Sequence, residues 1–448
     1  MRVLGFILLL AVMAGAQGVE EVYRERARKI IAAALENEEG MKKLEYLCDR
    51  IGHRLSGSEA FLKAVAWSAQ QMIEGGLENV ATPKVKIPHW ERGQESAEIV
   101  APVRAPLGIL GLGMTGGGDV TAEVVGVKSF EELEKLGRAG VEGKIVLFHP
   151  PWVSYGVTGA FRRQGPTRAA KLGAKAVLIR SAGIPAANSA HTGTTMFDAG
   201  VTPIPAGALT EESLGVLERL VKKGERVVVH YRSEAKILPD ADGANVIGEI
   251  RGSEKPEEVV VISGHLDSWD VGQGAHDDAS GCIAPLEALL LLKKLGLRPK
   301  RTIRVVFWAN EENGTRGGLA YRDQNKEQLK NHVIAIEMDG GAERPLGLGV
   351  TGGGEVALKQ MQAIGRLLQP IGAGMVTAGG GGTDIGPIMR EGVIGSGVRT
   401  VGKRYMEWHH TAADTLDKIE PMEFRKHIAQ LAVFAYVLAD MEERLGRK

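Results

Sequence analysis

The sequence predicts an α/β protein whose main domain is a doubly wound, mostly parallel sheet, with a second domain inserted into it. From about residue 243 onward, apolar strand-like runs alternate with helix-like segments, which is the pattern of parallel α/β sheets. Between residues 119 and 235, a separate series of short strands and helices carries no cluster of acidic residues. A chain of 448 residues is also longer than one typical domain, so two structural units are expected.

The start of the chain has the features of an export signal. Arg2 supplies a short positive region, residues 3–13 form an apolar run, and residues 14–16 are the small residues A-G-A. A membrane anchor would need roughly 20 apolar residues, which this run does not reach. We therefore expect residues 1–16 to be a signal peptide cleaved near Ala16, and the mature protein to be secreted or periplasmic.

The N-terminal part of the main domain is expected to span residues 17–118. Residues 20–75 place apolar side chains at the spacing of amphipathic helices, whereas residues 80–91 and 97–100 read as strands. The glycine-rich stretch 111–118 then marks a domain boundary.

The inserted domain is expected to span residues 119–235. Residues 143–148 and 174–179 are short apolar runs that predict buried strands, and residues 226–231 close the unit. Because this segment offers no metal-ligand cluster, its expected task is to narrow access to the main domain. Residues 236–448 then form the C-terminal part of the main domain, which is discontinuous in sequence.

Charge and cysteine content exclude some classes of protein. Lys plus Arg and Asp plus Glu each number 55, so the net charge is zero and indicates no attraction to nucleic acid or to a membrane surface. The two cysteines are Cys48 and Cys282. Export permits a disulfide, but Cys282 sits where a small buried thiol also fits, so we expect free thiols.

Metal-ligand residue types follow three predicted strands in the C-terminal part. The apolar run 259–262 leads into S-G-H-L-D-S-W-D, residues 304–310 lead into E-E-N-G, and residues 333–338 lead into D-G. Strand ends converge at the edge where open α/β sheets keep their sites, so we expect these side chains to meet. A set of imidazole and carboxylate groups suits a site for two divalent cations.

Each residue type in this set has a role that metal chemistry requires. His265 can hold a metal while Asp267, two residues on, accepts its other N–H and fixes the tautomer. Asp277 opens a loop-to-helix junction, where a carboxylate can bridge two cations about 3.5–4 Å apart. Of the neighbours Glu311 and Glu312, one can ligate a metal while the other acts as a general base.

Two further motifs complete the set. Asp339 ends its strand and can close the shell of the first metal, and W-H-H-T-A-A-D-T (408–415) supplies a second imidazole. Alone, each motif has an ordinary interpretation, because D-D before a helix is often an N-cap and E-E after a strand is often a solvated turn. Their occurrence together favours the metal site.

The motifs H-L-D-S-W-D, G-A-H-D-D-A-S-G, N-E-E-N-G-T-R-G-G, M-D-G and H-H-T-A-A-D-T, in this order, resemble the M28 family of zinc metallopeptidases. The resemblance covers nearly the whole chain after the signal peptide. It implies an α/β zinc exopeptidase domain with an inserted protease-associated domain, two zinc ions (Zn2+) per chain and a homodimer. It also implies hydrolysis of short peptides with a free N-terminus, by a water that bridges the metals.

The resemblance implies a role for each candidate residue. The ligands of one zinc are His265, Asp277 and Asp339, and those of the other are Asp277, Glu312 and His410. Glu311 is implied as the general base, and Asp267 and Asp414 as residues that orient the ligands. His409 is not an implied ligand, because the ligating histidine of the family directly precedes Thr. The glycine-rich segment 379–384 implies substrate contacts from Gly381, Gly382, Thr383 and Asp384.

Two other functions stay open on the sequence. A glutaminyl-cyclase-like acyltransferase of the same fold would use one zinc, and a receptor-like binding module would be non-catalytic. The full ligand set argues against both. No arginine lies directly beside a candidate ligand to clamp a substrate carboxylate, and Arg316, at the end of N-E-E-N-G-T-R-G-G, and Arg399 are the nearest in sequence. We therefore expect the free amino terminus, rather than the carboxyl terminus, to be the recognised end.

Overall fold

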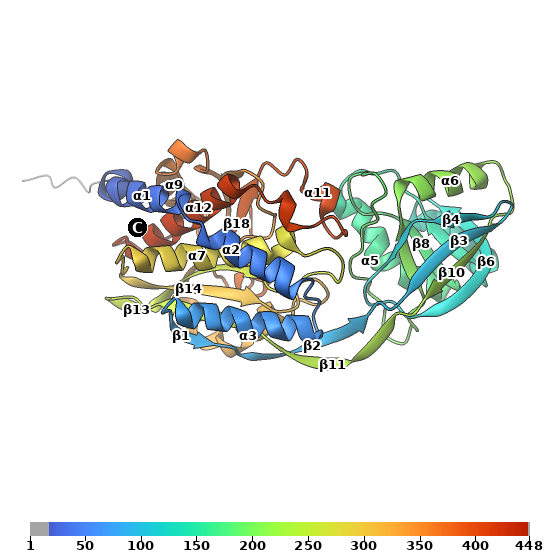
Figure 1. The fold of residues 1–448 in the computed structure, drawn as a ribbon, viewed down its shortest axis with the longest axis horizontal. Coiled ribbons are helices and arrows are strands. Elements are labelled where there is room, and N and C mark those ends of the chain that lie inside the picture. The colour runs from blue at the N-terminus through green and yellow to red at the C-terminus, as the bar shows by residue number, and fades with distance from the viewer. Residues whose placement is uncertain (1–17, 447–448) are drawn as a thin grey trace, which may run out of the picture.

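The computed structural model describes residues 18–446 as two lobes that lie side by side along the longest axis of the molecule (Figure 1). The first lobe holds both ends of the described chain, and the second lobe consists of residues 92–235. The expected signal peptide, residues 1–16, lies outside the described residues. Between residues 18 and 446, no helix is long and apolar enough to cross a membrane.

The first lobe is built on a mixed sheet whose central strands run parallel. Its strands, in spatial order, are β1 (Glu78–Ala81), β12 (Val246–Ile250), β14 (Arg301–Trp308), β13 (Lys255–His265), β15 (His332–Glu337), β18 (Gly395–Thr400), β16 (Pro345–Thr351) and β17 (Met375–Ala378). β14, β13, β15 and β18 pair in parallel, whereas β12 and β16 pair antiparallel with β14 and β18. The parallel centre agrees with the predicted α/β fold class.

Helices cover both faces of this sheet. They are α1 (Val19–Leu35), α2 (Glu39–Glu45), α3 (Glu59–Glu74), α7 (Ser280–Lys294), α8 (Arg316–Gln324), α9 (Gly354–Arg366), α10 (Gly386–Met389), α11 (Tyr405–Trp408) and α12 (Pro421–Asp440). On β13, Val260 and Ile262 share a core with α7 and α12, while Val259 and Val261 share another with α8 and α10. Alternate residues of a strand face opposite sides, so a strand buried on both sides is apolar throughout.

One histidine of this lobe is held neutral by its surroundings. The Nδ1 atom of His332 lies 3.2 Å from the carbonyl oxygen of Gln328, and its Nε2 atom lies 2.8 Å from the hydroxyl of Tyr321. That hydroxyl accepts a hydrogen bond from Arg304, which leaves its own proton for Nε2. Burial is the largest cause that lowers the pKa of His332 to about 4.

The second lobe contains its own sheet, and it begins earlier than the sequence predicts. Its strands, in spatial order, are β4 (Ala105–Leu107), β3 (Glu95–Ala101), β10 (Val228–Ser233), β6 (Gly118–Val127), β7 (Ile145–Phe148), β8 (Ala176–Arg180), β9 (Ala206–Leu209) and β5 (Ile109–Gly111). Its helices are α4 (Phe130–Val141), α5 (Tyr155–Lys171) and α6 (Glu211–Lys222). The expected boundary at residue 119 falls inside this sheet, because β3, β4 and β5 precede it and pair here rather than in the first lobe.

Two long strands join the lobes. β2 (Lys84–Glu91) leads into the second lobe and β11 (Lys236–Ala244) leads out of it, and the two pair antiparallel. Next to this ribbon, Arg92 binds both carboxylate oxygens of Asp270, with Nε 2.8 Å and Nη2 2.6 Å away. Trp90 packs edge-on against Trp269 with ring centroids 6.5 Å apart. These contacts tie the second lobe to the loop that follows β13.

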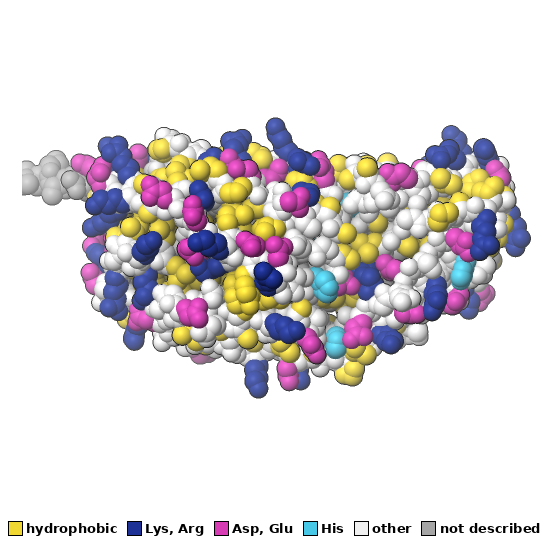
Figure 2. All heavy atoms as spheres, in the orientation of Figure 1, with side chains coloured by type: hydrophobic (Ala, Val, Ile, Leu, Met, Phe, Trp, Pro, Cys, Tyr) yellow, Lys and Arg dark blue, Asp and Glu magenta, His cyan; other side chains and the backbone are white. Residues whose placement is uncertain are grey.

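The surface and the cysteines agree with the composition. Figure 2 shows basic and acidic side chains interspersed over the face in view, as the zero net charge suggests. Cys48 and Cys282 are both buried and unpaired, as expected.

Candidate metal centre and active site

The predicted site residues meet at the carboxyl end of three neighbouring parallel strands. His265 is the last residue of β13, Glu311 and Glu312 follow β14, and Asp339 follows β15. β13 pairs in parallel with both β14 and β15, so all three ends reach the same edge of the sheet. Asp277 joins them from the segment between β13 and α7.

One cluster surrounds the Nε2 atom of His265. This atom lies 3.1 Å from Oδ1 of Asp277 and 3.3 Å from Oδ1 of Asp339. The three donor atoms lie within 4.8 Å of one another, close enough to hold one metal ion. The structure thus brings together the three residues predicted for the first metal.

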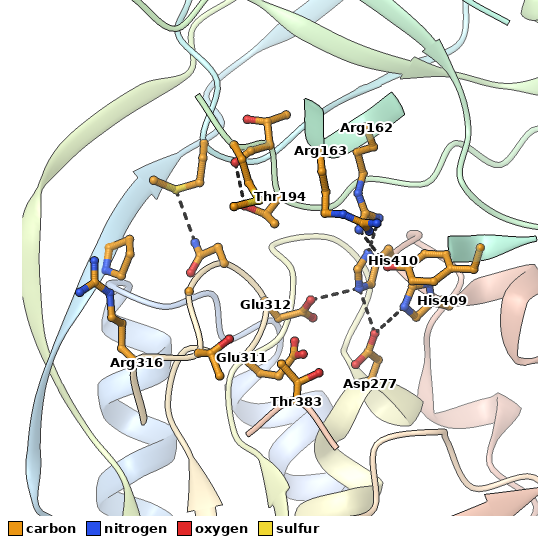
Figure 3. Close-up of a pocket in the computed structure, with 18 of the residues that line it drawn as sticks. Arg162, Arg163, Thr194, Asp277, Glu311, Glu312, Arg316, Thr383, His409 and His410 are labelled. Carbon is orange, nitrogen blue, oxygen red and sulfur yellow. Dashed lines mark hydrogen bonds and ion pairs between the residues drawn. The ribbon is translucent and has the colours of Figure 1, made fainter. Parts of the chain in front are cut away.

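A second cluster surrounds the Nε2 atom of His410. This atom lies 3.3 Å from Oδ2 of Asp277 and 3.1 Å from Oε2 of Glu312 (Figure 3). The Asp277 carboxylate therefore presents one oxygen to each cluster. A shared carboxylate is what a pair of closely spaced cations requires.

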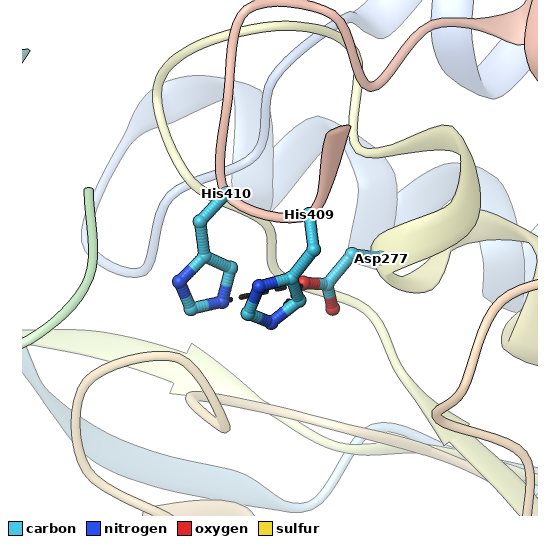
Figure 4. A group of neighbouring side chains, drawn as sticks. All are labelled: Asp277, His409 and His410. Atoms are coloured by element: carbon cyan, nitrogen blue, oxygen red, sulfur yellow. Dashed lines mark ion pairs between the residues drawn. The ribbon is translucent and has the colours of Figure 1, made fainter. Parts of the chain in front are cut away.

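His409 lies beside His410 and also approaches Asp277 (Figure 4). The two imidazole rings stack with centroids 3.7 Å apart, and Nε2 of His409 lies 3.5 Å from Oδ2 of Asp277. Asp277, His409 and His410 could therefore also hold an ion together. His410 stays the predicted ligand, because its Nε2 atom contacts the carboxylates of both Asp277 and Glu312.

The buried carboxylates of Asp414 and Asp278 hold the Asp277 segment. Asp414 accepts hydrogen bonds from the main-chain N–H groups of His276, at 2.8 Å, and Asp277, at 3.1 Å. Asp278 accepts from the N–H groups of His265 and Gly281, each at 3.0 Å. The peptide bond between Asp277 and Asp278 is cis. Asp414 therefore contacts the backbone of a candidate ligand, as expected of an orienting residue, whereas the sequence pattern indicates no role for Asp278.

Asp267 orients different groups from those predicted. The Nδ1 atom of His265 lies 3.0 Å from the main-chain carbonyl oxygen of Asp267, and 3.8 Å from its carboxylate. The carboxylate instead accepts hydrogen bonds from the Ser56 hydroxyl, at 2.9 Å, and from the N–H groups of Glu311, at 3.0 Å, and Glu312, at 3.4 Å. The expected contact is wrong because the backbone carbonyl, which the sequence pattern does not show, lies closer to the ring.

The donor set fits metal ions. Nδ1 of His265 lies within hydrogen-bonding distance of a carbonyl oxygen, and its Nε2 faces two carboxylate oxygens. With the ring proton on Nδ1, Nε2 would be free to bind a metal. Nδ1 of His410 lies 3.3 Å from the carbonyl oxygen of Thr192, so its Nε2 faces Asp277 and Glu312 in the same way. Imidazole nitrogens and carboxylate oxygens that converge in this way can surround a cation, whose positive charge stabilises the carboxylates.

Negative charge accumulates in this region. Burial, followed by the charge of Asp339, raises the pKa of the Glu311 carboxyl well above its ordinary value. Burial, followed by the charge of Asp277, raises the pKa of Glu312 to about 7. Oδ2 of Asp277 is buried and has no hydrogen-bond partner among the described residues. Carboxylates crowded in this way are stabilised by bound cations.

A cavity of about 880 Å³ lies between the two lobes and is lined by residues of both. Asp277, Glu311, Glu312 and Asp339 line it from the first lobe, and side chains of α5 line it from the second. Among the four residues predicted to contact substrate, only Thr383 lines this cavity. Gly381, Gly382 and Asp384 do not, and Asp384 is 0% exposed. The glycine-rich segment turns inward at Asp384, which a residue pattern alone does not indicate.

The second lobe also contacts the predicted ligand His410. The N–H group of Thr192 donates to the carbonyl oxygen of His410 at 3.0 Å, and His191 Nδ1 lies 2.7 Å from the carbonyl oxygen of His409. Nη1 of Arg162 lies 3.3 Å from Nδ1 of His410. These contacts join segments more than 200 residues apart, so no local sequence signal could have identified them.

Comparison with known proteins places this site in a family. The profile of peptidase family M28 matches residues 245–435. Carboxypeptidase Q of Mus musculus is 41% identical over 431 residues, which cover 95% of this chain and 91% of that protein. A peptidase M28 precursor from Shewanella amazonensis SB2B has a TM-score of 0.90 at 31% identity, covering 95% of this chain and 98% of that one.

A more distant structure shares the fold. An aminopeptidase from Aneurinibacillus sp. strain AM-1 has a TM-score of 0.68 at 22% identity, covering 94% of this chain and 98% of that one. The identity to carboxypeptidase Q extends over both lobes, and the matched profile contains every candidate metal ligand. The chain therefore belongs to peptidase family M28 and is a metallo-exopeptidase.

Proposed function

We propose that this protein is an exported exopeptidase that uses two zinc ions to hydrolyse short peptides with a free N-terminus. One observation carries the proposal: the two oxygens of the Asp277 carboxylate face different imidazoles. Oδ1 faces Nε2 of His265, and Oδ2 faces Nε2 of His410. A solved structure with this fold, that of a zinc aminopeptidase from Bacillus subtilis, supports zinc as the metal.

Five residues would hold the metals, and a sixth would act as the base beside them. His265, Asp277 and Asp339 would hold one zinc, and Asp277, Glu312 and His410 the other. Bound zinc would act as a Lewis acid and lower the pKa of water. Glu311 lines the cavity beside these ligands and takes no part in either cluster. It is therefore placed to accept a proton from the attacking water and to return it to the leaving amine.

The surrounding residues would fix this arrangement. Asp267 holds the N–H groups of Glu311 and Glu312, and Asp414 holds that of Asp277. We propose that the second lobe, residues 92–235, is a protease-associated domain inserted into a catalytic domain of residues 17–91 and 236–448. The covering position of this lobe would confine the cavity to short peptides. Residues 1–16 would direct export and be removed.

Replacement of the proposed base tests the assignment. Glu311→Gln keeps the shape of the side chain but cannot accept a proton, so the rate should fall by about 10²–10⁴-fold while zinc content stays at the wild-type value. The exposed Glu391→Gln is a matched control that should leave both unchanged. Activity of Glu311→Gln within about tenfold of wild type would show that another group is the base.

A further inference from the structure

Two arginines of α5 bring positive charge to the cavity wall beside the candidate metal centre. Arg162 is 3% exposed, Arg163 is half-buried, and both line the cavity. Figure 3 shows their guanidinium groups next to His410, facing the space above Glu311. Among residues 18–446, neither forms an ion pair with a carboxylate.

Arginines without a counter-charge are uncommon in the second lobe. Those that pair with a carboxylate are Arg92, Arg104, Arg138, Arg168, Arg180, Arg226 and Arg232. Arg219 is exposed, so water can solvate its charge. A guanidinium buried without an anion is costly, because it loses water and gains no opposite charge. The wall formed by Arg162 and Arg163 is therefore complementary to an anion.

We propose that Arg162 and Arg163 bind a carboxylate of the substrate, carried by the residue that follows the scissile bond. The enzyme would then favour short peptides that end one residue beyond that bond. This inference rests on the proposed function, because it takes the scissile bond to lie at the candidate metal centre.

The guanidinium of Arg162 is held in position before any ligand arrives. Nη1 donates to the carbonyl oxygen of Thr192 at 3.1 Å, and Nη2 donates to the hydroxyl of Tyr155 at 2.9 Å. Its Nε is buried without a hydrogen-bond partner in the described part of the chain. Gly193 makes room for the group, because a Cβ there would lie 2.2 Å from Nη1. Arg163 forms no such hydrogen bonds with the residues that the structure describes, so its side chain can adjust to a ligand.

Arg162 lies close to the candidate metal centre. Nη1 of Arg162 lies 3.3 Å from Nδ1 of His410, and Nε2 of the same ring contacts Asp277 and Glu312. The arginine is thus one imidazole ring away from the candidate metal ligands. Consecutive Cα atoms in a peptide are about 3.8 Å apart, so a carboxylate one residue beyond the scissile bond falls beside the arginines.

The arginines that the sequence suggested are less well placed for this task. Nη2 of Arg399 donates to the carbonyl oxygen of Gly379 at 2.7 Å. Arg316 lines the cavity, but Figure 3 shows it on the side away from His410. The carboxylate itself could be the α-carboxylate of a C-terminal residue or the side chain of an Asp or Glu, and both present the same chemistry to a guanidinium.

Binding of three related peptides to the zinc-loaded Glu311→Gln protein tests the proposal without turnover. Isothermal titration would compare alanyl-leucine, alanyl-leucine amide and alanyl-glutamate amide. A charge-assisted hydrogen bond corresponds to about 10- to 100-fold in affinity, so alanyl-leucine should bind at least about tenfold more tightly than its amide. Equally tight binding of alanyl-glutamate amide would identify a side-chain carboxylate as a second source for the same site.

Substitution of the half-buried Arg163 tests whether the two arginines cause the preference for a free carboxylate. Adding Arg163→Ala should bring the acid and the amide to within about threefold, with zinc content and thermal midpoint unchanged. Arg168→Ala, on the same helix but paired with Glu134, is the matched control and should keep the full preference. Equal binding of acid and amide to the parent would overturn the proposal, as would a preference that survives both Arg163→Ala and Arg162→Lys.

Hydrolysis by the wild-type protein separates this inference from the proposed function. Cleavage of alanyl-leucine at a rate well above that of its amide would support both the carboxylate site and the proposed exopeptidase activity. A binding preference for the acid together with no hydrolysis of any short peptide would refute the proposed exopeptidase activity and still support the carboxylate site.

Discussion

Replacement of Asp267 by Asn separates the position that the structure gives this carboxylate from the one that sequence alone suggests. The carboxylate accepts hydrogen bonds from the N–H groups of Glu311, at 3.0 Å, and Glu312, at 3.4 Å, and is fully buried. An amide keeps one acceptor oxygen but turns an NH2 group toward a donor, so at least one of these bonds is lost. We therefore expect kcat to fall, because the backbone that carries the proposed base loses its support.

The size of this effect follows from the bonds involved. A hydrogen bond to a buried charged group contributes about 1.5–3 kcal/mol, and the longer of the two main-chain bonds is the weaker. A loss of about 2–3 kcal/mol of transition-state stabilisation corresponds to about a 30- to 150-fold decrease in kcat. His265 keeps its main-chain acceptor, the Asp267 carbonyl, so zinc content should change little.

Steady-state kinetics on a dipeptide, with zinc analysis of the same samples, measures both quantities. Ser56→Ala is the matched control, because it removes one donor to the same carboxylate and leaves both bonds to Glu311 and Glu312. It should lower kcat by less than about tenfold. If Asp267→Asn instead loses zinc and keeps kcat per bound zinc within about threefold of wild type, the carboxylate acts on His265 and our reasoning is refuted.

Three further results are expected. Asp277→Ala should lose both zinc ions, because its carboxylate presents an oxygen to each cluster, and metal analysis would show the loss. His410→Ala should lower the affinity for one zinc, measured by titration of the metal-free protein, whereas His409→Ala should retain both ions. Stability should fall as pH decreases from about 6.5 to about 4, because His332 has a lowered pKa when folded and takes up a proton more readily when unfolded. Denaturation midpoints of wild type and His332→Gln across this range should converge at low pH.

Each of these expectations has a contrary outcome. One zinc retained by Asp277→Ala would show that the carboxylate does not bridge the two positions. Equal loss of zinc from His409→Ala and His410→Ala would make both imidazoles ligands. A pH dependence unchanged by His332→Gln would place the acid-sensitive group elsewhere in the chain.

Three positions of the candidate metal site could be placed from the sequence because each follows an apolar run that predicts a strand. Apolar runs before His265, Glu311 and Asp339 place all three at one sheet edge, and parallel pairing of β13, β14 and β15 then brings them together. Fold class follows from the same alternation of strands and helices. Neither inference needs contacts between residues that are distant in sequence.

Other features depend on contacts that no local pattern records. The second lobe starts before residue 119 because β3 pairs with β10 and β5 pairs with β9, both far along the chain, while β4 pairs with β3. The carboxylate of Asp267 binds main-chain N–H groups more than 40 residues away. Arg162 reaches His410 from a different lobe. Asp384 belongs to a glycine-rich segment that suggests substrate contact, yet its side chain is buried.

The number of zinc ions that the metal-free protein binds tests the two-metal centre most directly. Titration with zinc, followed by calorimetry and by elemental analysis after dialysis, should give about two ions per chain for wild type and about one for His410→Ala. Peptidase activity should reach its maximum only as the second equivalent is bound. A wild-type protein that saturates at one zinc with full activity, or binds none, would contradict the account of Asp277 as a carboxylate shared between two metals.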